Sequence, residues 1–409
     1  MNRIIEVVGD PSYGTNQLLP GLPAVSNWNC NILLALTQIG LLTAPPRYHG
    51  FHLSTFWAWL RYVPAIDSRK ADLRLRRAWS EMDPHQKTIL ADDFGVGFSC
   101  QYLIDNHQLQ FFADTRYVLD RCLGTLVSPV TVNQGKFKSP DFIGVDAFGH
   151  LHVIECKGSQ SSRGYLKTAM ESGIDQKNNL SGNIFRSCMV GGFFVPQFNN
   201  KEVAQLRFID PAPDPRMRML ADVEPGAIVR AIRILAFAKF LSAAGLWRSA
   251  SVLTEGRAVS TDVNFVRDLR TGELRFAGYE RQLDSGDWVK EIDYRSFEEQ
   301  GSDSVDAQAI KTSLKIRIPD YIADLAHSAV TPDGTVNLNT LDAELASREK
   351  LNRHTVELPR EIVEEGIRMD LDQTTRAPET SWHRDELGEN SASITTPFGI
   401  ELSLSRAQF

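Results

Sequence analysis

The sequence predicts an α/β protein with more than one domain. Its 409 residues are enough for two or three domains, and 42% hydrophobic and 23% charged residues are ordinary for a soluble globular chain. The clearest pattern lies between residues 88 and 196, where segments follow in the order helix, strand, strand, strand, helix, strand. Short β-branched or apolar runs bounded by turn residues predict the strands, and longer amphipathic runs predict the helices.

The N-terminal region, residues 1–87, is expected to be helical. Helices are predicted at 27–43, 54–63 and 71–82, the last of them amphipathic and basic. A further helical stretch is expected over 88–123, and it contains the acidic pair Asp92 and Asp93.

The predicted core, residues 88–250, continues with strands. GTLVSPVTVNQG at 124–135 is β-branched and bounded by glycine, which predicts a strand. A hairpin at 139–159, a helix at 162–180 and a strand at 185–196 are expected to follow it.

An apolar segment at 226–247 has the length of a membrane span. It contains Arg230, Arg233 and Lys239, however, and three cations make a spanning helix costly. We therefore expect a buried helix whose basic side chains extend to the surface.

The region from 251 to 409 is expected to form a mixed α+β domain. Two segments after residue 260 resemble the strands of a hairpin, and residues 341–409 contain fourteen Asp or Glu against eight Lys or Arg. This acidic domain is expected to contact a protein partner or a second copy of the chain rather than nucleic acid.

Charge and cysteine content restrict the class of protein. The net charge of −7 argues against indiscriminate nucleic-acid binding but leaves room for a local basic patch. The five cysteines form no CxxC pair, so their spacing signals neither zinc nor an iron–sulfur cluster. An odd cysteine count and an N-terminus without a long apolar stretch predict a cytoplasmic protein.

The candidate reactive residues lie in the hairpin predicted at 139–159. Residues 147–149 are expected to form a three-residue turn with Gly149 in the left-handed conformation, which places Asp141 opposite Glu155. Two facing carboxylates repel each other, and a divalent cation would offset the repulsion. The carbonyl group of Cys156 is a possible further ligand, and Lys157 would lie beside the ion, where it can bind a phosphate oxygen or orient a water.

Two histidines lie near the turn of the same hairpin. His150 and His152 are two residues apart, so both should face the side opposite Glu155. They are expected to be exposed strand residues rather than metal ligands.

Pro140-Asp141 followed by Glu155-Cys156-Lys157 resembles the motif of the PD-(D/E)XK nuclease superfamily. The resemblance implies a restriction-endonuclease-like core of αβββαβ order. It also implies Mg²⁺ or Mn²⁺ held by Asp141 and Glu155, with Lys157 assisting the attacking water.

Two further roles come only from this resemblance. Many members add an acid from the first core helix, for which Asp93 is preferred over Asp92, although Val96 stands where those members have glycine. Some members have a glutamine in the helix after the lysine, which Gln176 matches, although Leu180 stands in place of the tyrosine that follows there.

Basic residues suggest where a phosphate backbone would lie. Six Lys or Arg fall between residues 61 and 78 against two Asp. Arg69, Lys70, Arg74 and Arg77 are candidates for phosphate contacts, and Arg163 and Lys167 are candidates after the hairpin. The alternatives are a solvated helix face for the first group and a plain loop for the second.

The sequence therefore predicts a Mg²⁺-dependent nuclease, most simply a DNA endonuclease. Bacterial defence or mobile-element processing is the role that the resemblance implies. A protein partner or self-association is expected to supply specificity, because the acidic chain would bind DNA weakly alone. The alternatives are a non-catalytic subunit that binds nucleic acid or assembles a complex, and an RNA nuclease.

Overall fold

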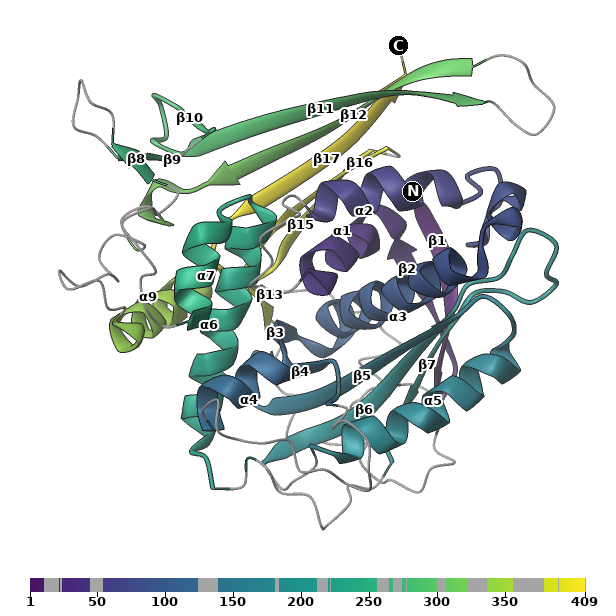
Figure 1. Ribbon diagram of the computed structural model, residues 1–409, viewed down its shortest axis with the longest axis horizontal. Helices are drawn as coiled ribbons and strands as arrows, with labels where there is room; N and C mark the ends of the chain where they lie inside the picture. The colour runs from purple at the N-terminus through teal and green to yellow at the C-terminus, as the bar shows by residue number, and fades with distance from the viewer. Residues whose placement is uncertain are drawn as a thin grey trace.

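In the computed structural model of the protein (Figure 1), the described residues are 1–10, 22, 24–44, 54–123, 139–180, 184–211, 220, 222–255, 265–267, 274–276, 278–299, 307–322, 325, 337–355, 379–388 and 390–408. They form a seven-stranded sheet with helices on both faces and a six-stranded sheet across one side. The predicted α/β class is confirmed.

The seven-stranded sheet has the order β2-β1-β7-β6-β5-β4-β3. Its strands are β1 (Asn2–Gly9), β2 (Ser26–Asn31), β3 (Leu109–Asp114), β4 (Phe142–Asp146), β5 (Leu151–Ser159), β6 (Phe185–Phe194) and β7 (Gln205–Ile209). β3, β4 and β5 are antiparallel neighbours, whereas β5 and β6 are parallel. A parallel pair needs a crossover, and helix α5 (Arg163–Asn178) supplies it.

Helices α3 (Pro84–His107) and α5 cover opposite faces of this sheet (Figure 1). Alternation along β6 shows the arrangement directly, because successive residues of a strand face opposite sides. A side chain at Gly191 would contact Ser99 of α3, and one at Gly192 would contact Met170 of α5.

The remaining helices pack around this unit. They are α1 (Ile32–Thr43), α2 (Ser54–Tyr62), α4 (Thr115–Leu123), α6 (Pro225–Ala243), α7 (Trp247–Glu255) and α9 (Leu338–Leu351). Short 3₁₀ helices occur at Val63–Ala65 and Arg77–Glu81.

The long helix expected over 88–123 is interrupted. Asp83 caps α3 through its side chain and Pro84 occupies the first turn, both of which favour a helix start. The helix ends at Gln108, which has a left-handed φ of 57°. β3 and α4 follow, so the predicted helix contains a strand. The strand predicted at 124–135 lies outside the described residues.

The N-terminal region is not wholly helical, contrary to the prediction. β1 pairs with β2 and with β7, so this region contributes two strands to the central sheet. α1 begins only at Ile32, where the side chain of Asn31 accepts hydrogen bonds from the first turn. Of the helix predicted at 71–82, only the 3₁₀ helix Arg77–Glu81 is present; before it, Leu73 and Leu75 are buried with a period of two, and Asp72 and Leu75 form isolated β-bridges.

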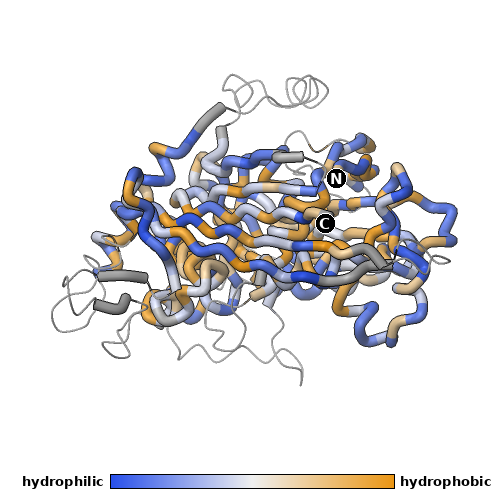
Figure 2. Tube along the Cα trace, turned by 90° about the horizontal axis from the view of Figure 1, so that it is seen from above, coloured by the Kyte–Doolittle hydropathy of each residue, from blue (hydrophilic) through white to orange (hydrophobic). Residues whose placement is uncertain are grey.

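The six-stranded sheet has the order β10-β11-β12-β17-β16-β15. Its strands are β10 (Glu280–Arg281), β11 (Trp288–Glu299), β12 (Ala307–Ile318), β15 (His383–Gly388), β16 (Ser391–Thr395) and β17 (Glu401–Gln408). Hydrophobic and hydrophilic residues alternate along its strands (Figure 2). The hairpin expected after residue 260 is present as β8 (Phe265–Arg267) and β9 (Leu274–Phe276), and β13 (His354–Thr355) pairs with β14 (Glu379–Thr380).

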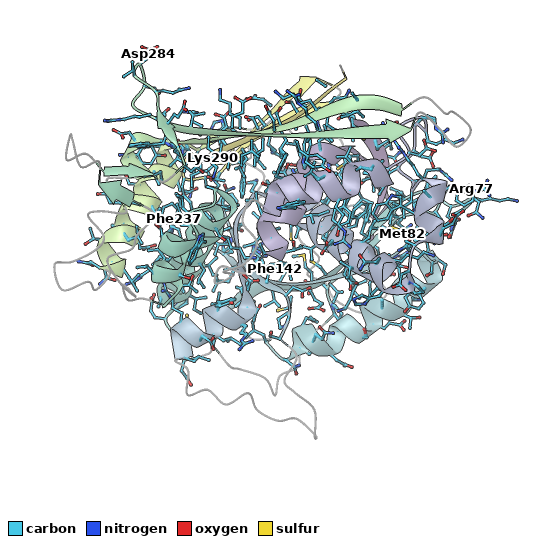
Figure 3. All side chains as sticks on the ribbon, turned by 45° about the horizontal axis from the view of Figure 1, so that its top comes forward. Arg77, Met82, Phe142, Phe237, Asp284 and Lys290 are labelled. Carbon is cyan, nitrogen blue, oxygen red and sulfur yellow. The ribbon has the colours of Figure 1, made fainter. Side chains whose placement is uncertain are left out.

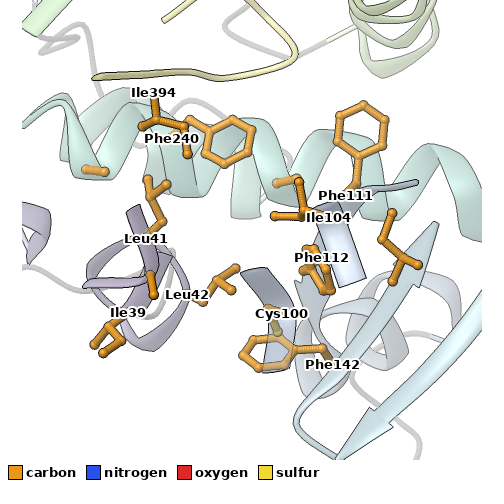
Figure 4. Packing of buried hydrophobic residues seen from close by; sticks show 14 of the residues in the cluster. Ile39, Leu41, Leu42, Cys100, Ile104, Phe111, Phe112, Phe142, Phe240 and Ile394 are labelled. Atoms are coloured by element: carbon orange, nitrogen blue, oxygen red, sulfur yellow. The ribbon is translucent and has the colours of Figure 1, made fainter. Parts of the chain in front are cut away.

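One hydrophobic core joins the N-terminal helices, the central sheet and the C-terminal sheet. Figure 4 shows Leu42 of α1, Ile104 of α3, Phe112 of β3, Phe240 of α6 and Ile394 of β16 within it. The strands of the central sheet and the members of this core thus come from both sides of the expected boundaries at 87 and 250.

α6 corresponds to the apolar segment at 226–247, and it is a buried helix as predicted. Arg233 is partly buried and pairs with Asp342 of α9. Lys239 does not extend to the surface; it is 2% exposed and bonds to the carbonyl group of Leu42. Within the described part of the chain, no helix is long and apolar enough to cross a membrane.

Candidate functional site

The site is built on the β4–β5 hairpin. Phe142 pairs with Ile154 and Ile143 with Val153, which is the predicted register. The turn is also as predicted, since Gly149 has a left-handed φ of 85°. Asp141, immediately before β4, therefore lies opposite Glu155.

Backbone hydrogen bonds hold the two acids together. The N–H of Asp141 donates to Glu155 Oε2 at 3.1 Å, and the N–H of Cys156 donates to Asp141 Oδ2 at 2.8 Å. Glu155 is completely buried, whereas Asp141 is partly exposed. The hairpin thus holds two carboxylates at the point where β4 begins and β5 continues.

Lys157 and Gln176 complete the cluster. Lys157 Nζ forms an ion pair with Glu155 Oε1, and its side chain retains 20% exposure. With the amide of Gln176 oriented by its hydrogen-bond partners, its nitrogen donates to Glu155 Oε1 at 2.7 Å and its oxygen accepts from Lys157 Nζ at 3.3 Å. Gln176 comes from α5, which crosses this face of the sheet.

α5 approaches the cluster closely because Gly173 has no side chain. A Cβ atom there would lie 3.2 Å from Glu155 Cγ and 3.3 Å from Lys157 Cε. The helix therefore packs directly over the acid and the lysine, which places Gln176, one turn later, beside both of them.

Burial controls the protonation of the cluster. Burial and the charge of Asp141 raise the pKa of Glu155 to about 8, against the opposing effect of Lys157. Burial also raises the pKa of Asp141, despite the hydrogen bond from the Cys156 N–H. Burial lowers the pKa of Lys157, but the charges of Glu155 and Asp141 outweigh it and keep the pKa above its ordinary value. Burial thus favours the protonated form of both acids, and their charges favour the charged form of the lysine.

Asp92 and Asp93, the two candidates for an acid from the first core helix, have different contacts. The Tyr62 hydroxyl donates to Asp93 Oδ2, and Asp93 is occupied by this contact. Asp92 interacts with Lys157, and its charge contributes to the raised pKa of Asp141. The rotation of α3 on the sheet therefore favours Asp92 over Asp93 as the acid of this helix.

Cys156 contributes its backbone. Its side chain is buried on the opposite face, where it interacts with Cys100 of α3. Its N–H is bonded to Asp141. The thiol is therefore directed away from the carboxylates. The predicted metal ligand is the carbonyl group of Cys156, and that role stays a prediction.

The two carboxylates of the site are a donor set that suits a hard divalent cation. In the described part of the chain, no group of three or more His, Cys, Asp or Glu side chains is arranged to hold a metal ion. Mg²⁺ commonly needs only one or two carboxylates, with water and phosphate oxygens as the other ligands. Asp141 and Glu155 meet that requirement, and a cation would offset the burial cost that raises both of their pKa values.

Sequence reasoning missed Asp114 and Lys239, which lie near the start of β4. Thr115 follows Asp114 in the chain, and its backbone N–H donates to the carbonyl oxygen of Asp141 at 3.1 Å. Lys239 Nζ of α6 lies 3.0 Å from Asp114 Oδ2 and 5.2 Å from the centre of the Phe142 ring. The three cations within the apolar segment 226–247 were the available signal, but nothing local indicated that Lys239 would meet the end of β3.

The predicted basic residues are only partly available. Arg69 pairs with Asp67 at 2.9 Å, and Arg74 pairs with Asp72 and also donates to the carbonyl oxygen of Asn200 at 2.8 Å. Arg163 lies 3.1 Å from a carboxylate oxygen of Glu6. The structure therefore uses three of the six candidates in local contacts.

The other three candidates, Lys70, Arg77 and Lys167, are exposed. Arg77 projects from the edge of the molecule (Figure 3), with its guanidinium 5.9 Å from the centre of the Phe198 ring. Lys167 lies on α5, the helix that carries Gln176.

A second polar cluster lies at the turn end of the hairpin. His152 is 1% exposed rather than exposed as predicted, and its ring nitrogens contact Ser187 Oγ at 2.8 Å and Asp146 Oδ2 at 3.3 Å. Asp146 also accepts from the N–H and the ring of His150, the more exposed of the two histidines. Ser187 is buried as well, and its contact with His152 joins the turn end of the hairpin to β6.

Comparison with family models, with curated proteins and with solved structures finds no match to this chain. The arrangement of Asp141, Glu155, Lys157, Gln176 and Asp92 is therefore the basis for inferring what the protein does.

Proposed function

We propose that this protein is a Mg²⁺-dependent nuclease with a restriction-endonuclease-like core. The observation that carries the proposal is the convergence of Asp141, Glu155 and Lys157 with Gln176 from the crossover helix. The element order α3, β3, β4, β5, α5, β6 supports it, since this is the αβββαβ order of that core with α4 added.

Each residue of the cluster has a distinct role in phosphodiester hydrolysis. Asp141 and Glu155 would hold Mg²⁺ or Mn²⁺, and Asp92 would add an acid from α3. The bound cation would lower the pKa of a water and neutralise charge on the phosphate. Lys157, kept protonated by the two acids, would contact a phosphate oxygen or the attacking water. Gln176 bonds to both Glu155 and Lys157 and so would fix the lysine in position.

DNA is the proposed substrate. Lys70, Arg77 and Lys167 are exposed and would contact phosphates. Arg69, Arg74 and Arg163 would first have to break their ion pairs with acidic residues. Work in bacterial defence or mobile-element processing, in the cytoplasm, is the role that we propose from the resemblance of the motif.

The direct test is cleavage of supercoiled plasmid and of linear DNA with Mg²⁺ or Mn²⁺, set against EDTA. We expect metal-dependent cutting that Asp141→Ala and Lys157→Ala abolish. Asp175→Ala is the matched control, because Asp175 is an exposed acid of α5 beside Gln176. A single-stranded RNA of the same sequence distinguishes a DNA nuclease from an RNA nuclease.

The result against the proposal is equally specific. Cutting that persists in EDTA, or in both variants, would exclude this hairpin as the active site. If no cutting occurs, calorimetric titration of the protein and of Asp141→Ala with Mg²⁺ decides between an inactive enzyme and a non-catalytic subunit. Absence of Asp141-dependent binding would favour the non-catalytic subunit.

A further inference from the structure

Tyr165 presents an exposed aromatic ring on α5, the helix that carries Gln176. The residue is 62% exposed, and within the described part of the chain its ring contacts no other aromatic ring and its hydroxyl group has no hydrogen bond. Its backbone N–H donates to Ser162 Oγ at 3.0 Å, in the first turn of the helix. The backbone of Tyr165 is therefore held in place, while its side chain is available to a molecule outside the chain.

Helical spacing places Tyr165 on the side of α5 that faces the acid cluster. One stripe of this helix consists of residues spaced by four, three and four positions: Tyr165, Ala169, Ser172 and Gln176. Gln176, at the end of the stripe, contacts Glu155 and Lys157. Tyr165 therefore begins a line of side chains that leads to the cluster.

The other flank of α5 faces away from the cluster. On that flank Arg163 lies 3.1 Å from a carboxylate oxygen of Glu6 in β1 and 3.9 Å from one of Glu202, shortly before β7. β1 and β7 are separated from β5 by β6. Tyr165, two residues after Arg163, is turned from it by about 200° around the helix axis. It therefore lies on the flank toward β5, the strand that carries Glu155 and Lys157.

Tyr165 is near enough to the cluster for one strand of nucleic acid to contact both. Gly173 approaches Glu155 Cγ and Lys157 Cε, and it follows Tyr165 by eight residues, or about 12 Å along the helix axis. Consecutive nucleotides of a strand are about 3.4 Å apart along the axis of B-DNA. A strand that runs along α5 and is cut at the cluster would therefore pass Tyr165 within a few nucleotides of the cut.

An exposed tyrosine ring suits an unpaired base better than a base pair. Every base has an aromatic face, which is open to a side chain in a single strand but is covered by neighbouring base pairs in a duplex. Stacking also adds affinity that does not depend on charge, which is useful to a chain with a net charge of −7.

We propose that Tyr165 stacks on an unpaired base of the strand that is cut, so that the substrate is DNA with an unpaired stretch beside the cut. The inference rests on the proposed function, because that function places the cut at the cluster. Tyr165 is thus a substrate-binding residue, and its contribution is to the choice between single-stranded and duplex DNA.

The first test is the binding of a labelled single strand and of the duplex with the same sequence, measured by fluorescence anisotropy in EDTA. Tyr165→Ala should weaken binding of the single strand by roughly tenfold and leave duplex binding unchanged. Tyr165→Phe keeps the ring and should bind as the wild type does. Tyr294→Ala is the matched control, because Tyr294 is a 46% exposed tyrosine on the other sheet.

Abasic sites placed one at a time along the strand locate the contact. At one position, loss of the base should weaken wild-type binding as much as Tyr165→Ala does. The same abasic site should cause no further loss in Tyr165→Ala, because the stacking partner is already absent. With Mg²⁺ added, that position should lie within a few nucleotides of the cut.

Two outcomes separate this proposal from the proposed function. If the protein cuts DNA through Lys157 but Tyr165→Ala binds the single strand as tightly as the wild type, the stacking proposal is overturned and the nuclease function stands. If the protein cuts no DNA but loses its affinity for the single strand in Tyr165→Ala alone, the nuclease function is overturned and the stacking contact is supported. An equal loss in Tyr294→Ala would also overturn the stacking proposal.

Discussion

Glu155 combines complete burial with a neighbouring carboxylate and a raised pKa of about 8. In the unfolded chain its pKa returns to about 4.5, so the native state binds more protons than the unfolded state between these two values. Stability contributed by this group is therefore full at low pH and is lost as pH rises toward about 8. A bound cation would counteract that loss by stabilising the charged form.

Replacing Glu155 with glutamine tests this coupling. Glu155→Gln resembles the protonated acid at every pH, so its melting temperature without metal should not share the wild-type decline as pH rises from about 4.5 to about 8. Near the upper pH, Mg²⁺ should raise the wild-type melting temperature by at least about 2 °C and leave that of the variant unchanged. Thermal unfolding monitored by circular dichroism measures both effects. If the melting temperatures of the two proteins change with pH in the same way, the result would contradict a raised pKa for Glu155.

Gln176 acts through its neighbours rather than on the substrate. It bonds to Glu155 and Lys157, so its loss should disturb their orientation without removing either charge. We expect Gln176→Ala to lower the cleavage rate by roughly 10- to 100-fold, the usual effect of removing a residue that orients a metal ligand. Single-turnover cleavage at saturating Mg²⁺ measures the change, with Asp175→Ala as the control. An unchanged rate would show that Lys157 is positioned without Gln176.

At the scale of elements, the close contact between α3 and β5 brings Asp92 to the site. A Cβ atom at Gly158 would lie 1.6 Å from the Ala91 carbonyl oxygen, and one at Gly95 would lie 2.5 Å from the Lys157 carbonyl oxygen. Both obstacles are backbone atoms, which cannot rotate away. The two glycines thus allow the helix to rest directly on the strand that carries Glu155 and Lys157.

Gly158→Ala should therefore force α3 away from β5. We expect it to destabilise the fold by about 1–3 kcal/mol and to reduce cleavage, because Asp92 and Lys157 would separate. Gly164→Ala is the matched control in the first turn of α5, where the nearest atom to the new Cβ is Ser162 Oγ at 3.7 Å. Alanine there should be neutral or stabilising by up to about 1 kcal/mol. Urea unfolding compares the two, and equal stabilities would rule out the close contact.

The elements that could be predicted are those determined by local pattern. The hairpin register followed from its turn and alternation, whereas Gln176 was expected only from the resemblance of the motif to that of the PD-(D/E)XK superfamily. β3 was missed because a short apolar run such as LQFFAD has no period that separates strand from helix. The choice between Asp92 and Asp93 depends on how α3 is rotated against β5, and the meeting of Lys239 with Asp114 depends on a tertiary contact. Neither the rotation of α3 nor the contact of Lys239 can be predicted from the sequence of one segment alone.

At the scale of the whole molecule, charge limits how nucleic acid can bind. The chain has a net charge of −7, and three of its six candidate phosphate contacts are already paired with acids. Lys70, Arg77 and Lys167 are exposed. Recruiting Arg69, Arg74 or Arg163 would require breaking an ion pair, which offsets the gain from a phosphate contact.

The salt dependence of DNA binding tests this division. If only Lys70, Arg77 and Lys167 contact phosphates, the logarithm of the binding constant should fall with the logarithm of salt concentration with a slope of about −3. Lys167→Ala should reduce that slope by about one, because it removes one phosphate contact. Arg69→Ala should leave the slope nearly unchanged, since Arg69 remains paired with Asp67. Fluorescence anisotropy of a labelled duplex in EDTA, where the DNA stays intact, gives the slopes. An Arg69→Ala effect as large as that of Lys167→Ala would mean that the ion pair opens on binding and that the basic surface extends over residues 67–77.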